Sequence, residues 1–353
     1  MQLNEDQLRE KHSERYLELE KQIREKDAIL LNYKKEHGKL EIFFDRLTNF
    51  ISPIIEVPIL YRGSAKQLLS ETPTTAVMQI SDGHTGATQM QDEIEGFNEF
   101  NVEISERRQT AYAYDFVKWV EMHRNSYRID EAAVIVTGDL ISGDIHEELK
   151  ITNEFPITMQ VCKASEILAK QISILAPHFK KVTVHFITED NHSRLTKKPQ
   201  AKEAGINSMN YLVGKMASLY LKELSNVEFN IYPQFEKVIH VENIQYLISH
   251  GHNVMGWMGI PWYAIERKVN KESTNRMQII MREVERAKDI GFHKYIFGHW
   301  HTPFDSQTYA CCGSVSGCDA YDHKDARWAL PSQSSWMVHA KHGEFNRINF
   351  RLK

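Results

Sequence analysis

Cysteine is scarce in this chain, and the few cysteines present form no recognisable pattern. The 353 residues include Cys162, Cys311, Cys312 and Cys318. These positions show neither the paired spacing of a zinc finger nor a disulfide framework. We therefore interpret all four as free thiols, which suits a reducing compartment.

An excess of charge of one sign is also missing. The chain has 43 lysines and arginines against 47 aspartates and glutamates, which gives a formal net charge of −4. No global field would attract nucleic acid, so any basic binding surface must be local. Because no cationic start is followed by an apolar core and a cleavage site, we expect a cytoplasmic location.

Residues 244–265 lack Asp, Glu, Lys and Arg, and the run is long enough to cross a bilayer. It nevertheless contains two histidines, an asparagine, a glutamine, three glycines and Pro261. These residues would be costly in lipid but suit a strand that leads into a site loop. We expect no membrane partner.

Residues 1–52 are densely charged in both signs and predict a helical extension. Apolar residues recur there in steps of three and four, at Tyr16, Leu19, Ile23, Leu30, Tyr33, Leu40, Phe44 and Leu47. Lys26, His37 and Gly38 interrupt this seam, so a dimerising coiled coil, a helical hairpin and a helix packed on its own domain all remain open. A homodimer is the partner that the first alternative implies. Residues 53–75 are predicted to be a linker.

Residues 76–353 are predicted to form a layered α/β domain, because short apolar runs alternate with helical stretches. The expected strands are 76–81, 132–137, 181–187, 227–232, 238–249 with a turn at 242–243, and 294–297. The expected helices are 98–123 and 158–175, and a hairpin is expected from 335–340 and 345–352. The hydrophobic content of 42% is enough for one large core.

Acidic, amide and imidazole side chains follow directly on nearly every predicted strand, where open α/β sheets build their sites. The five strand-end clusters contain Asp82 and His84, then Asp139, then Asp190, Asn191 and His192, then His250 and His252, and finally His299 and His301. Each pair alone is a weak signal, since a histidine is more often structural than a ligand. Together the clusters supply enough oxygen and nitrogen ligands for two divalent ions that share a carboxylate.

In this order the motifs resemble those of the calcineurin-like metallophosphoesterase family, over roughly residues 76–320. Residues 143–149 and 191–199 are also similar to metallophosphoesterases encoded by tailed bacteriophages, for which the location would be the host cytoplasm. The resemblance implies a sandwich of two mixed sheets with helices outside. It also implies a phosphoester hydrolase with two metal ions, manganese first among iron, zinc and nickel.

Carried over residue by residue, the resemblance implies a role for each site residue. Asp139 bridges the two metals and a hydroxide lies between them, while His192 faces the leaving group as a proton donor. The first metal is held by Asp82, His84, Asp139 and His301, and the second by Asp139, Asn191, His250 and His299.

Asp190 departs from the family pattern, which usually has glycine before the Asn-His pair. Aspartate tolerates left-handed backbone better than most residues, so the turn could survive. The added carboxylate could perturb His192, support the metal ligands from behind, or weaken the site. The sequence does not choose among these outcomes.

Residues near the motifs are candidates for substrate binding. Arg194, Lys197 and Lys198 follow His192 closely and could grip a phosphate, although a run of charge is usually only a solvated face. His252 and His146 are further candidates, and His250 is preferred over His252 as the metal ligand. Three aromatic residues after His252 could stack on a base, but core packing is the favoured interpretation for them: Trp257, Trp262 and Tyr263.

The expected function is a phosphodiesterase or nuclease that acts on nucleic acid or a nucleotide. A phosphomonoesterase for a protein or a small metabolite is the alternative within the same chemistry. An inactive metal-binding scaffold is the alternative from a different class, suggested by Asp190 and by the charged N-terminal segment.

Overall fold

The computed structural model describes residues 21, 24–27, 31, 72–145, 147–256 and 259–353. The chain divides into two compact units, Met1–Ser52 and Pro53–Lys353. The described residues of the first unit are helical. Every residue of the predicted coiled-coil seam, and residues 53–71 of the predicted linker, lie outside the described residues.

The second unit contains a six-stranded sheet in the order β11-β10-β1-β2-β3-β4. Its strands are β1 (Pro73–Ile80), β2 (Arg128–Val136), β3 (Lys181–Ile187), β4 (Val227–Tyr232), β10 (Ser332–His339) and β11 (Gly343–Arg351). The strands β1 to β4 run parallel, and the hairpin of β10 and β11 joins antiparallel to β1. The carboxyl ends of the four parallel strands therefore meet at one edge.

A five-stranded sheet has the order β5-β6-β7-β9-β8. Its strands are β5 (Lys237–Val241), β6 (Ile244–Ile248), β7 (Lys294–Phe297), β8 (Phe304–Asp305) and β9 (Tyr309–Cys311). The turn between β5 and β6 falls at the predicted place, with Glu242 in left-handed conformation at φ 52°. The strands β6, β7 and β9 are parallel.

The two sheets pack face to face around a buried apolar layer. Val77 and Ile135 from the first sheet contact a cluster that includes Tyr246 and Ile296 from the second. Trp336 of β10 is fully buried in this layer and donates its indole N–H to the Tyr246 hydroxyl oxygen at 2.9 Å. The mixed α/β sandwich predicted from the sequence is the observed architecture.

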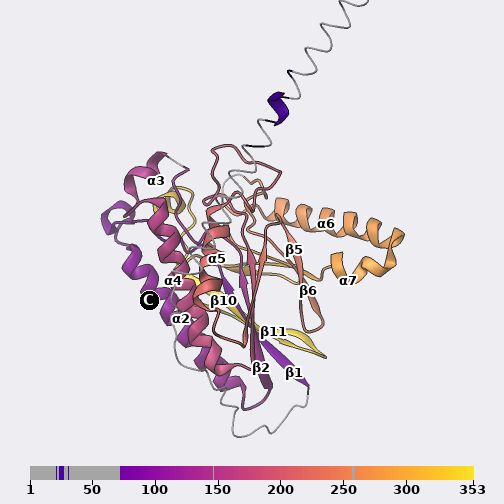
Figure 1. Ribbon diagram of the computed structural model, residues 1–353. Helices are drawn as coiled ribbons and strands as arrows, with labels where there is room; N and C mark the ends of the chain where they lie inside the picture. The colour runs from indigo at the N-terminus through magenta and orange to yellow at the C-terminus, as the bar shows by residue number, and fades with distance from the viewer. Residues whose placement is uncertain (1–20, 22–23, 28–30, 32–71, 146, 257–258) are drawn as a thin grey trace, which may run out of the picture. The chain divides into compact units, whose positions relative to one another are not determined.

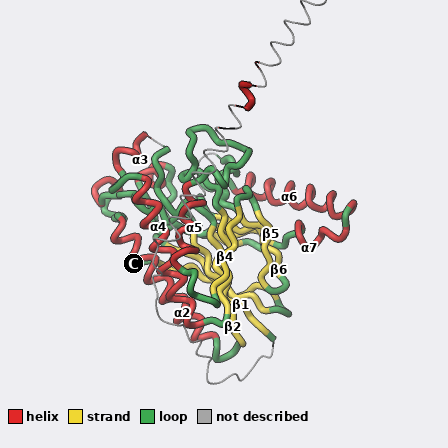
Figure 2. Tube along the Cα trace, viewed as in Figure 1, coloured by secondary structure: helices red, strands yellow, loops and turns green. Residues whose placement is uncertain are grey.

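Helices flank both outer faces of the sandwich (Figures 1 and 2). The helices α2 (Val102–His123), α4 (Ile157–Leu175) and α5 (Met209–Tyr220) lie over the six-stranded sheet, and α6 (Trp262–Arg282) packs Ile265 and Val269 against Tyr295 and Phe297 of the other. The short helices are η1 (Gln91–Ile94), α3 (Glu147–Thr152), η2 (Ala176–His178), η3 (Val284–Arg286), α7 (Ala287–Ile290) and α8 (Ala320–Lys324).

Three expectations about local structure need correction. The helix expected from residue 98 begins at Val102, because the Asn101 side chain caps it by accepting the Ile104 N–H at 2.8 Å. The helices α5 and α6 were not predicted. Core packing is wrong for Trp262 and Tyr263, which are 49% and 77% exposed in the first turn of α6, and Trp257 lies outside the described residues.

Among the described residues, no helix is both long enough and apolar enough to cross a membrane. Within the run at 244–265, residues 244–248 form β6 and residues 262–265 begin α6.

Candidate metal centre

The five predicted clusters lie on loops at the carboxyl ends of β1, β2, β3, β6 and β7, and backbone hydrogen bonds tie these loops together. The Asp82 N–H donates to the Gly138 carbonyl and the His84 N–H to the Asp139 carbonyl, both at 3.0 Å. The Gly298 N–H donates to the His250 carbonyl at 2.9 Å. The two sheets thus place their terminal loops at one common site.

Five of the expected ligands have left-handed backbone conformation. Their φ values are 50° for Asp82, 41° for His84, 50° for Asp139, 70° for His299 and 55° for His301. Such conformations cost about 1–3 kcal/mol each in residues other than glycine, and they persist only where the surroundings impose them. Their concentration in these loops marks a functional site.

The first group of side chains consists of Asp82, His84 and His301. Each offers a ligand atom within 4.8 Å of the others. The His84 Nε2 and His301 Nε2 atoms are 3.0 Å apart, and the His301 Nε2 atom lies 3.6 Å from Asp82 Oδ1. Two imidazole nitrogens directed at each other, beside a carboxylate, are the ligand set of a divalent transition metal.

The second group consists of Asp139, His250 and His299, with Asn191 at its side. The His250 Nε2 atom lies 2.9 Å from Asp139 Oδ2 and 2.9 Å from Asn191 Oδ1. Asp139 also clusters with His84 and His192. Its carboxylate therefore lies between the two groups, where a shared ligand would have to be.

Hydrogen bonds at the back of the site set the tautomers of three imidazoles. The Nδ1 atom of His250 lies 2.8 Å from the Thr137 carbonyl, and that of His192 lies 2.6 Å from the Ser142 carbonyl. A carbonyl only accepts, so Nδ1 carries a proton, and Nε2 is the ring atom that faces the site and would bind a metal once it is deprotonated. His301 is held in the same way by Asp322, at 2.5 Å.

Electrostatic coupling inside the cluster shifts several pKa values. Burial opposes ionisation of Asp139, but His250 and His192 hold the pKa of its carboxyl well below the ordinary value. Burial alone would lower the pKa of His250, and Asp139 instead raises it to about 10. Burial lowers the pKa of His84 and of His299 well below the ordinary value. The chain therefore keeps these two rings neutral, as metal ligands must be.

Asp322 was not predicted from the sequence. It lies in α8, is 1% exposed, and accepts from both His301 Nδ1 and Arg327 Nε, the latter at 2.8 Å. Asp319, the N-cap of α8, completes a cluster with His301 and Asp322. Because α8 follows His301 by about twenty residues with no recurring motif between them, no spacing signal could have revealed this pair.

Asp190 supports the site from behind. It is 1% exposed, and its carboxylate accepts the Asp139 N–H at 2.9 Å and the Ser193 N–H at 2.7 Å. Asp190 is not among the described residues with positive φ, so the expected left-handed turn is wrong at this position. Burial and the charge of Asp139 raise the pKa of Asp190 well above its ordinary value, and the two backbone N–H donors only partly oppose this rise.

The expected substrate contacts are dispersed. His192 is half-buried, with its ring 4.7 Å from that of His84. Lys197 pairs with Glu147, Lys198 is exposed and Arg194 is half-buried. His252 belongs to none of the metal-ligating clusters among the described residues and lies 3.4 Å from Glu189, and His146 lies outside the described residues.

Fold and site together define a two-sheet α/β protein with a buried cluster of metal-ligating side chains. No family model and no curated protein matches the chain. Among solved structures, it is similar to a conserved uncharacterized protein of Streptococcus pneumoniae TIGR4, a predicted phosphoesterase. The identity is 10% and the TM-score 0.27, over 79% of this chain and 98% of the other.

Two further structures are similar to the chain. Vps29 of Entamoeba histolytica, complexed with Zn²⁺, is 13% identical with a TM-score of 0.25, over 78% of this chain and 99% of the other. Vacuolar protein sorting 29 of Cryptosporidium parvum is 11% identical with a TM-score of 0.29, over 79% and 98%. These TM-scores are too low to carry a functional conclusion, and none of these structures supports a bacteriophage origin.

Proposed function

We propose that the chain is a metal-dependent phosphoester hydrolase whose site holds two divalent cations. The main support is a pair of carboxylates, Asp82 and Asp139, which are at most 1% exposed and belong to the two groups of ligand atoms. In the described part of the chain, the ion pairs of Asp82 and Asp139 are with histidines, and no lysine or arginine pairs with either carboxylate. Buried anions require compensating charge, and bound cations would supply it.

When bound, such cations lower the pKa of water toward neutrality and offset the negative charge of phosphate oxygens. Asp139 lies between the two ligand groups and would be a ligand of both cations. His192 is anchored through Nδ1 on Ser142, and its Nε2 atom lies 3.9 Å from Asp139 Oδ2. In that position a protonated Nε2 could donate to the leaving-group oxygen.

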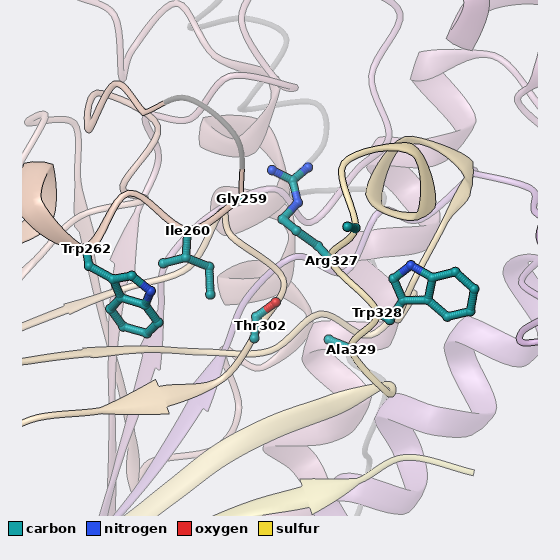
Figure 3. A pocket seen from close by; sticks show the side chains of 8 residues that line it. Gly259, Ile260, Trp262, Thr302, Arg327, Trp328 and Ala329 are labelled. Atoms are coloured by element: carbon teal, nitrogen blue, oxygen red, sulfur yellow. The ribbon is translucent and has the colours of Figure 1, made fainter.

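For the substrate we propose a phosphodiester of nucleic acid or a nucleotide. Thr302, the residue directly after the expected ligand His301, is one of the residues that line a cavity of about 240 Å³ (Figure 3). Its lining includes Trp262 and Trp328, which are 49% and 47% exposed, and Arg327. Exposed indole rings offer faces on which a base can stack, and a guanidinium group suits a flanking phosphate.

The experiment that tests the activity is hydrolysis of bis-p-nitrophenyl phosphate and p-nitrophenyl phosphate with Mn²⁺. Asp139→Asn should abolish turnover, whereas Asp115→Asn, at an exposed position of α2, should leave it unchanged. Diester cleavage that depends on Asp139 supports the proposal, and cleavage of the monoester alone favours a phosphomonoesterase. If neither ester is cleaved with any divalent metal while two ions stay bound, the chain is an inactive scaffold and the proposal is wrong.

The substrate class has its own test in the cavity. Trp328→Leu should raise KM for thymidine 5′-p-nitrophenyl phosphate by about 5- to 150-fold, the range expected for loss of one base stack, with little change in kcat. Tyr114→Leu, an exposed aromatic position on α2, is the matched control. An unchanged KM in Trp328→Leu would remove the support for a nucleotide in this cavity.

A further inference from the structure

The side chain of Asp190 connects three elements that carry or support the metal centre. Asp139 follows β2, Ser193 lies in the loop after β3, and Asn210 is the second residue of α5. One carboxylate oxygen of Asp190 accepts the Asp139 N–H at 2.9 Å, the Ser193 hydroxyl at 3.1 Å and the Asn210 side-chain amide. The other oxygen accepts the Ser193 N–H at 2.7 Å.

These hydrogen bonds fix the backbone around two expected ligands, Asp139 and Asn191. Asp139 has a left-handed backbone with φ 50°, and its N–H is one of the groups that Asp190 binds. Asn191 and His192 lie between Asp190 and Ser193, so the bonds from Ser193 close the loop that carries both. Asp190 therefore helps to order three groups of the site: the Asp139 carboxylate, the Asn191 amide and the His192 imidazole.

Gly138 makes room for this anchor. Its φ is 99°, and a Cβ atom added there would lie 3.0 Å from the Asp190 Cβ and 3.0 Å from His250 Nδ1. A side chain at position 138 would therefore push apart the anchor and an expected ligand. The glycine before Asp139 and the aspartate before Asn191 fit each other sterically.

We propose that Asp190 is a positioning residue for the second group of ligands. Its side-chain hydrogen bonds stabilise this loop at the position where the family that the sequence resembles usually has glycine. The inference rests on the proposed two-cation site. Asp190 affects two expected ligands of the second cation, Asp139 and Asn191, but only one of the first. Removal of the Asp190 side chain should therefore lower the affinity for the second cation more than the affinity for the first.

Both acceptor oxygens of Asp190 are required. All of its partners donate, so an asparagine would direct its amide N–H at a donor whichever way the side chain turned. Asp190→Asn thus keeps the volume and loses the anchor. Asp322→Asn is the matched control, since it makes the same replacement at a side chain that is 1% exposed, but one that holds His301 of the first group.

The test is a Co²⁺ titration of the full chain, read from the visible absorption of the bound ion, with Mn²⁺ competition. In Asp190→Asn the affinity for one cation should fall by about 10- to 100-fold, the usual effect of losing a group that orients a ligand, while the other cation remains. In Asp322→Asn the other spectral component should weaken. If Asp190 had a purely structural role, its replacement would lower the affinity for both cations equally or leave both affinities unchanged.

Asn210→Ala and Ser193→Ala keep the carboxylate and provide the test if Asp190→Asn does not fold. Each substitution removes one side-chain donor to Asp190. Each should lower the affinity for the same cation by a smaller factor than Asp190→Asn does. Two cations bound with unchanged affinity and spectrum in the Asp190 or Asn210 variants would overturn this inference alone. A wild-type chain that binds no cation would overturn both the inference and the proposed function.

Discussion

At the scale of single residues, His192 is the side chain whose role depends most on the chemistry of the substrate. A proton donor matters when the leaving group is a poor one, and matters little for p-nitrophenolate, which leaves as the anion. We predict that His192→Ala lowers kcat by about 10²- to 10⁴-fold for an alkyl phosphodiester and by much less for bis-p-nitrophenyl phosphate. The measurement is a series of esters of increasing leaving-group pKa.

The control for that series is His342→Ala, at an exposed histidine. This substitution should leave kcat unchanged for every ester in the series. An equal loss for all leaving groups in His192→Ala would show that the ring shapes the site without donating a proton.

Individual residues also show where sequence reasoning stops. The expected ligands could be named because each follows a predicted strand, and the structure brings Asp82, Asp139 and His250 together as that pattern requires. Asp322 could not be found, since its contact with His301 depends on how α8 folds back. Asp190 could be recognised from the sequence as a departure from the family pattern. Its hydrogen bond to Asn210 could not be predicted, because Asn210 belongs to a helix that was not predicted.

At the scale of elements, the loop after β2 is held close to the loop after β3 by a glycine. Gly143 has φ 71°, and a Cβ atom there would lie 2.1 Å from the His192 carbonyl oxygen. We predict that Gly143→Ala costs about 3 kcal/mol or more in unfolding free energy, and lowers activity by moving His192. Thermal or urea unfolding measures the first effect and ester hydrolysis the second.

Gly96→Ala is the matched control for this substitution. Gly96 has a similar φ of 78°, but no other group lies within 4 Å of an added Cβ. It should cost only the left-handed penalty of about 1–2 kcal/mol and leave activity unchanged. Equal effects in the two variants would contradict the assigned contact.

The pair of β3 and β4 contains a histidine that should make the fold sensitive to acid. Burial lowers the pKa of His185 to about 4, and its Nδ1 atom lies 2.9 Å from the Tyr232 hydroxyl. Between that value and the unfolded pKa of about 6.5, only the unfolded chain binds the proton, so stability falls as pH decreases through this window. The loss contributed by His185 approaches about 3 kcal/mol at pH 4.

We predict that His185→Gln removes this part of the pH dependence, measured by urea unfolding from pH 7 to pH 4 with a chelator present. His240→Gln, at an exposed position of β5, should retain it. Parallel pH profiles for the wild type and His185→Gln would contradict the prediction.

Prediction from sequence succeeded for elements that carry a clear pattern. The strands β1, β2, β3 and β7 are short apolar runs that end at a polar cluster, and the hairpin of β5 and β6 has its turn where the apolar run breaks. The short strand β9 carries no such pattern and was not predicted. The helix α6 lacked such a signal because only Ile265 and Val269 on it are buried. Its exposed aromatic residues resembled core, and the sequence pattern contained nothing to show that the helix leaves them at the surface.

At the scale of the whole molecule, the near balance of charge hides an uneven distribution. The net charge of −4 is small, yet the buried carboxylates of Asp82 and Asp139 lie among imidazoles at one edge of the sandwich. The fold therefore carries an electrostatic cost that two cations would relieve. Since such ions bind the folded chain, they should stabilise it by RT ln(1 + [L]/Kd), about 2.7 kcal/mol at 100 times Kd.

The most direct test of this account is the number of divalent cations bound per chain, counted by elemental analysis after saturation with Mn²⁺ and removal of free metal. We predict two ions for the wild type, and fewer for Asp139→Asn because the carboxylate between the two ligand groups is lost. A saturated wild-type chain that holds no ion or one ion, or an Asp139→Asn variant that still holds two with equal affinity, would contradict the central claim.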